Sequence, residues 1–108
     1  MQQDFPFQPR GATGTTPTAQ TNIAVTTGVQ QLTLPAVQSE GGTIRIVNEG
    51  PANISWSFGV SASLTTGNGV LMLANTVETF GLPGGITQLS VIGTIAGSNM
   101  RVICGDGI

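Results

Sequence analysis

Turn-forming residues divide most of this 108-residue chain into short segments, and their spacing limits the possible folds more than any other feature. From Asn22 onward, glycine, asparagine or proline interrupts the apolar or alternating runs about every 8–12 residues, a spacing typical of β-sandwiches and small barrels. The turns at residues 66–69, 82–85 and 96–99 are examples. No helix of ordinary length fits between such turns, so the sequence predicts an all-β protein.

The abundance of threonine and glycine points the same way. The chain has fifteen threonines, whose branched β-carbon favours extended backbone, and sixteen glycines, which adopt turn dihedral angles freely. We expect an antiparallel β-sandwich, jelly-roll-like, that occupies residues 21–108 and has about eight short strands. The strands are expected at residues 22–27, 29–34, 43–48, 53–59, 70–73, 76–82, 87–94 and 100–104.

Alternation between apolar and polar residues predicts which side chains enter the core. Ile54, Trp56 and Phe58 alternate with Ser55 and Ser57, which indicates a half-buried strand with Trp56 inside. Two further strands offer one apolar face each, through the pairs Ile44 and Ile46, and Leu89 and Val91. Three such strands favour a sandwich with a single core.

Residues 1–20 follow neither the two-residue nor the 3.6-residue apolar period, so we expect an extended N-terminal arm outside the core. Its prolines favour an extended path that presents Phe5, Phe7 and Arg10. One interpretation is a frayed terminus. The other is an arm that crosses to a neighbouring subunit and docks its two phenylalanines there, because exposed phenylalanines on a loose tail gain little.

Ionisable residues are scarce. Three arginines and five carboxylates give a net charge of −2, only 7% of residues are charged, and lysine, histidine and tyrosine are absent. There is no basic field to attract phosphates, which argues against a nucleic-acid partner. A surface with few charges is also poorly protected against self-association, so we expect the chain to function in an assembly.

The same composition leaves little chemistry for catalysis. Without histidine, serine triads, cysteine–histidine dyads and histidine metal sites cannot form, and Cys104 is expected to be a small buried residue. Carboxylate catalysis needs two acids opposed roughly 5–10 Å apart across a cleft, and nothing in the spacing of the acids indicates this. We expect no catalytic residues, metal, cofactor or small-molecule substrate. The five acids are Asp4, Glu40, Glu49, Glu78 and Asp106.

No apolar run is long enough to cross a membrane, and the first ten residues do not have the pattern of a secretory signal. We therefore expect synthesis in the cytoplasm and no membrane partner. A single cysteine cannot form an internal disulfide, which suits assembly under reducing conditions.

A recurring pattern in small virion proteins of tailed bacteriophages resembles residues 46–107. The likeness runs through IVNEGPANISWSFGVSASLTT and then ANTVETFGLPGGITQLSVIGTIAGSNMRVICGDG, with Phe80 leading into the Leu-Pro-Gly-Gly turn and a Gly-Asp-Gly ending. It implies the jelly-roll-like family of capsid cement, or decoration, proteins. In that family a β-sandwich present in many copies clamps neighbouring major capsid proteins on the phage head and catalyses nothing.

The leading hypothesis is therefore a capsid decoration protein on the virion surface, assembled in the host cytoplasm. Its partners would be the major capsid protein, through Phe5, Phe7 and Arg10, and further copies of itself as a dimer or trimer paired through strand edges. The alternative is a tail or fibre module that recognises a host surface or a glycan, although the supply of aromatic residues for a sugar platform is thin. A small carboxylate-based enzyme is a third hypothesis.

Overall fold

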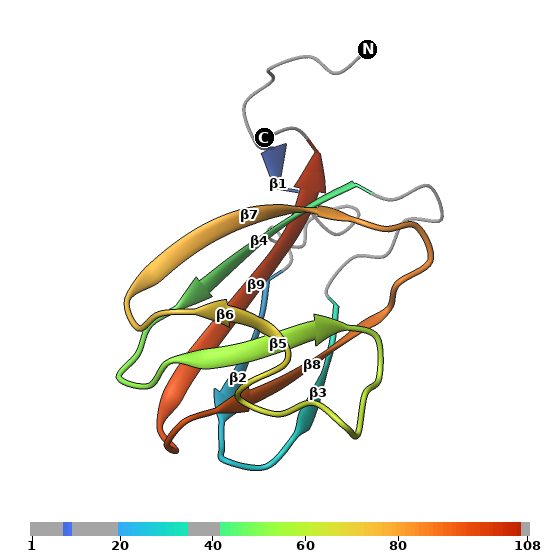
Figure 1. Cartoon of the computed structure of the whole chain (residues 1–108). Coiled ribbons are helices and arrows are strands. Elements are labelled where there is room, and N and C mark those ends of the chain that lie inside the picture. Colours follow the sequence, from blue (N-terminus) through green and yellow to red (C-terminus); the bar gives the residue numbers. More distant parts are fainter. Residues whose placement is uncertain (1–7, 10–19, 35–41, 107–108) are drawn as a thin grey trace.

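The computed structural model describes residues 8–9, 20–34 and 42–106, which form nine β-strands in two antiparallel sheets (Figure 1). No helix occurs in these residues, so none is long and apolar enough to cross a membrane. The strands are β1 (Gln8–Pro9), β2 (Gln20–Val25), β3 (Gln30–Thr33), β4 (Gly42–Asn48), β5 (Ile54–Phe58), β6 (Val70–Met72), β7 (Thr76–Leu82), β8 (Gln88–Gly93) and β9 (Ser98–Asp106).

The two sheets pack face to face as a β-sandwich. One sheet has the order β2-β9-β4-β7, and the other has the order β3-β8-β5-β6. The short strand β1 also pairs with β9, on the same side as β2. The predicted all-β class and the antiparallel sandwich are confirmed. Each of the eight expected segments overlaps one strand, and the bounds differ by a few residues at most.

Strand pairing is nested along the chain, from the outermost pair inward. β2 pairs with β9, β3 with β8, β4 with β7 and β5 with β6. Strands far apart in the sequence therefore lie side by side, as where Val25 stands opposite Ser98. The nesting also leaves β6 and β7, which are consecutive, as the last strands of the two sheets.

Most of the expected N-terminal arm, residues 1–7 and 10–19, lies outside the described residues. The part that is described, β1, pairs with the end of β9 opposite Gly105 and Asp106. Pro9 is compatible with this position because an edge strand tolerates a residue that lacks an N–H group.

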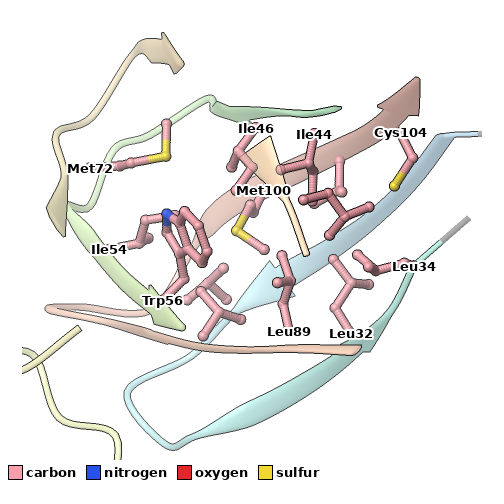
Figure 2. Close-up of a cluster of buried hydrophobic side chains, with 14 residues drawn as sticks. Leu32, Leu34, Ile44, Ile46, Ile54, Trp56, Met72, Leu89, Met100 and Cys104 are labelled. Carbon is pink, nitrogen blue, oxygen red and sulfur yellow. The ribbon is translucent and has the colours of Figure 1, made fainter. Parts of the chain in front are cut away.

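The core lies between the sheets and contains the residues that the alternation predicts. Trp56 and Ile54 of β5 are buried, as are Ile44 and Ile46 of β4, and Cys104 of β9 is buried with them (Figure 2). The remaining members of the cluster are Val25, Leu32, Leu34, Met72, Leu82, Leu89, Val91, Met100 and Val102. The expectation that Cys104 acts as a small buried residue is therefore confirmed with respect to its burial.

The outer face of β5 differs from the prediction, because the segment between β5 and β6, residues 59–69, packs over it. Ser55 is 2% exposed and its Oγ donates a hydrogen bond to the Thr66 carbonyl oxygen over 3.1 Å. Ser90 of β8, opposite Ser57 in the sheet, is fully buried, and Leu64 of the covering segment is buried as well. The expectation of a solvent-exposed serine face is wrong for Ser55, since only tertiary packing brings this segment across the sheet.

A close approach at Gly69 allows this segment to lie flat. A Cβ atom on Gly69 would stand 2.7 Å from the Leu64 Cδ1 atom and 2.8 Å from the Trp56 carbonyl oxygen. Real Cβ atoms do not approach other atoms so closely, so only glycine fits between the covering segment and β5.

A buried amide closes one end of the sandwich. Asn48, at the end of β4, is fully buried, and its Nδ2 atom donates to the carbonyl oxygens of Ala52 at 2.9 Å, Leu73 at 3.2 Å and Met72 at 3.4 Å. Its Oδ1 atom accepts from the Gly50 N–H at 3.0 Å. One side chain thus ties β4 to the turn that follows it and to the end of β6.

We expect Asn48→Ala to lower the free energy of unfolding by about 2–4 kcal/mol, because it removes the hydrogen bonds of a fully buried amide and leaves the Gly50 N–H without that partner. Chemical denaturation followed by tryptophan fluorescence measures the change. Asn22→Ala, at an exposed position on β2, is the matched control and should change the stability by less than about 0.5 kcal/mol. Equal effects of the two substitutions would contradict the role assigned to Asn48.

Candidate interaction surface

The acids whose side chains are described do not form a catalytic pair. Glu49 follows β4 and lies with Arg101 on the outer face of the five-stranded sheet, whereas Glu78 stands opposite the core residue Ile46 and so projects from the inner side of β7. The two carboxylates therefore project from opposite faces of one sheet. Among the described residues, no group of three or more acidic, cysteine or histidine side chains gathers to hold a metal ion.

Glu49 belongs to a small polar cluster on that outer face. Its Oε1 atom accepts a hydrogen bond of 2.6 Å from Asn99 Nδ2, and its Oε2 atom accepts one of 3.0 Å from Arg101 Nε. The backbone N–H of Glu49 also donates to the Asn99 carbonyl oxygen at 2.9 Å. The cluster fixes the end of β4 against β9, and as an exposed ion pair it contributes little to stability.

The residues predicted to dock on a partner, Phe5, Phe7 and Arg10, lie outside the described residues, as do Asp4 and Glu40. The structure therefore places none of these five. Arg45 lies within β4, inside a predicted strand, and projects from the outer face of the five-stranded sheet near Arg101.

The aromatic residues of the body are used for packing. Trp56 makes edge-to-face contacts with Phe58 and Phe80, with ring centroids 5.0 Å apart in both cases. Phe58 and Phe80 are half-buried against the core, and Phe80 comes from the opposite sheet. The Trp56 Nε1 atom has no hydrogen-bond partner among the described residues, so packing alone holds the ring. These three rings join the sheets and do not form an exposed platform.

Exposed apolar side chains occur on the two consecutive edge strands, β6 and β7, and on the turn that joins them. Four of them lie within eight residues: Val70 (41% exposed), Leu71 (57%), Leu73 (53%) and Val77 (57%). We call this surface the β6–β7 edge. It is charge-poor as well, because Glu78 is the only ionisable residue between positions 70 and 82. Leu71 pairs with Ser55 and Val77 with Val47, so these two side chains project from the outer faces of different sheets. Exposed apolar side chains on open strand edges are suited to association.

Hydrogen bonds hold the β6–β7 edge in a fixed position. In addition to the bond from Asn48, the Leu73 carbonyl oxygen accepts one of 2.6 Å from Thr76 Oγ1. The Ala74 N–H donates to Asn53 Oδ1 at 3.0 Å. The backbone between β6 and β7 is thus anchored to both neighbouring turns, and its exposed side chains stand on a rigid base.

Gly50 lets the turn after β4 pack closely against the turn between β6 and β7. A Cβ atom on Gly50 would lie 3.1 Å from Asn75 Oδ1 and 3.3 Å from the Ala74 Cβ atom, and the backbone φ of 77° also favours glycine. Asn75 itself has a φ of 62°, a conformation that asparagine tolerates better than most residues. The two turns therefore lock together at the end of the sandwich.

The opposite edge of the sandwich is polar. Among the side chains of β2 and β3 that the structure describes, the exposed ones are Asn22, Ala24, Gln31 and Thr33, and Ile23 is partly buried against the core. Comparison of the two edges therefore singles out the β6–β7 edge. The sequence predicts association through strand edges but does not say which edges take part. The apolar run from Val70 to Leu73 was a signal, but a strand period alone does not reveal which strands end a sheet.

The chain matches no family model, no curated protein and no solved structure. Its function is therefore inferred from its own residues and their arrangement.

The hydrogen bond from Asn99 to Glu49, followed by the bond and the charge of Arg101, holds the pKa of Glu49 below its ordinary value of 4.5. Because this pKa is lower in the folded chain than in the unfolded chain, ionised Glu49 stabilises the fold at pH values above its ordinary pKa. This contribution disappears as the pH falls through the folded pKa.

Asn99→Ala removes the largest cause of the lowering, so we expect the pKa of Glu49 to rise toward 4.5. A titration of the Glu49 side-chain carboxyl carbon by NMR measures it. Asn68→Ala, in the segment that covers β5, serves as the control and should leave the pKa unchanged. An unchanged pKa in Asn99→Ala would contradict the assignment.

Proposed function

We propose that this chain is a non-enzymatic structural protein of a virion, a capsid decoration protein that binds and stabilises the major capsid protein lattice of a tailed phage. The observation that carries the proposal is the β6–β7 edge, where Leu71, Leu73 and Val77 are more than half exposed on a rigid backbone with few charges. A small domain with such an exposed apolar surface is suited to function within an assembly.

The order of the strands supports the same proposal. Jelly rolls consist of two sheets and eight strands built from two Greek keys, and they are common in viral capsid domains. The nested pairs β2 with β9, β3 with β8, β4 with β7 and β5 with β6 agree with that plan. A shared architecture does not define a function, so this agreement supports the class of protein and not its partner.

The proposed role needs no catalytic chemistry. Many weak contacts around a closed shell add together, so each copy can bind modestly and still strengthen the lattice. In this proposal the arm residues Phe5, Phe7 and Arg10 bind the major capsid protein, and the sandwich contacts other copies of itself on the capsid surface. The inward position of Trp56, with Phe58 and Phe80 packed against it, disfavours the alternative of a glycan-binding tail or fibre module.

The arm can be tested without disturbing β1. We expect the double substitution Phe5→Ala with Phe7→Ala to abolish attachment to capsids while leaving the folded domain unchanged by circular dichroism, because it removes the apolar groups proposed to dock. Gln2→Ala with Gln3→Ala, in the same segment, is the matched control and should still attach. Normal attachment of the Phe5→Ala, Phe7→Ala variant to capsids would refute the docking role of the arm.

The number of copies in purified particles separates head from tail. We expect on the order of hundreds of copies per particle, since a lattice of modest contacts needs many of them. Quantitative mass spectrometry against the major capsid protein gives the ratio. A handful of copies would support the tail or fibre alternative, and absence from particles would refute both.

A further inference from the structure

β7 is an edge strand in the part of the chain that the structure describes. β4 pairs with all seven residues of β7, from Thr76 to Leu82, and no described strand pairs along the other side. Half of the backbone groups of an edge strand point away from its sheet and can accept another strand. Native proteins usually protect such an edge with charges, proline or a bulge, whereas β7 has Glu78 as its only charge and no proline.

Among the residues that the structure describes, nothing requires a glycine at position 81 of β7. Glycine in the interior of a strand costs about 0.5–1 kcal/mol relative to alanine. Gly81 is exposed, a Cβ atom there would meet nothing within 4 Å, and its φ is not in the positive region that requires glycine. A glycine of this kind often marks a place where another chain approaches closely.

We propose that β7 of a second copy adds antiparallel to β7, so that two five-stranded sheets join into one across a two-fold axis at Thr79. Thr79 is the centre of the seven-residue strand, and this register is the one that pairs the whole strand with its copy. A register displaced from Thr79 leaves residues at both ends unpaired. The inference is independent of whether the assembly belongs to a virion.

Side chains fit this register. Val77, 57% exposed on the outer face, stands opposite the open Gly81 of the second copy, and the contact repeats on the other side of the axis. Thr79 stands opposite Thr79, a favourable cross-strand pair. Glu78 stands opposite Phe80, so that no two like charges face each other. A register centred on Glu78 would oppose two carboxylates, which is unfavourable.

The size of the contact agrees with a weak but specific dimer. Seven paired residues make a contact about 24 Å long, and two layers about 10 Å apart bury on the order of 500 Å² per copy, the lower end of specific interfaces. We therefore expect dissociation constants in the micromolar range.

Sedimentation equilibrium of the full chain tests the pairing. We expect the average mass to rise toward twice the 11.0 kDa of one chain with concentration, and Thr79→Glu to weaken association at least about tenfold, because two carboxylates then face each other across the axis. Within one chain, the introduced carboxylate would stand beside Arg45 of β4, so the fold should tolerate the substitution. Thr33→Glu, on the exposed edge strand β3, is the matched control.

Disulfide trapping gives a second readout. Directly opposite residues of antiparallel strands have Cα atoms about 4.5–5.5 Å apart, within the range that a disulfide spans. We expect Thr79→Cys to form a covalent dimer with diamide, which takes the two electrons and two protons of the thiols, and Thr33→Cys to form far less. A chain that stays monomeric at about 1 mM, or equal behaviour of the Thr79 and Thr33 variants, would overturn the proposal.

Discussion

The buried amide of Asn48 is the interaction on which the arrangement of this sandwich most depends. Its Nδ2 atom donates to carbonyl groups of the turn after β4 and of the end of β6, and so joins two segments that are distant in the chain. Ser98, at the start of β9, extends the network because its Oγ atom accepts from the Ala52 N–H at 2.7 Å and donates to the Ala52 carbonyl oxygen at 2.9 Å. Polar contacts therefore fix one end of a core that is otherwise apolar.

This network explains why the β6–β7 edge can be both apolar and rigid. β6 has only three residues and lies at the end of its sheet, so little else would hold it in register. Asn48 and Asn53 anchor the backbone that leads from it into β7. A backbone that is already fixed loses little conformational entropy when a partner covers it, which favours association at this edge.

The apolar–polar alternation and the turn residues predicted the strands well, because both are properties of each strand and its own flanking residues. The alternation around Trp56 and around Ile44 identified core residues correctly, and the turn residues gave the bounds to within a few positions. The same pattern failed for Ser55, whose burial depends on residues 59–69 crossing the sheet. It also gave no information on which strands end a sheet, since that property belongs to the pairing order and not to any one strand.

The sequence by itself determined the all-β class, the apolar faces of the main strands and the poverty of ionisable groups, because strand period, turn propensity and charge are properties of short segments. Only the tertiary structure decided that β6 and β7 end their sheets together, that Asn48 binds the crossover between them, and that Gly81 lies open on an edge. These features join residues distant in the chain, and nested pairing, not local preference, brings them together.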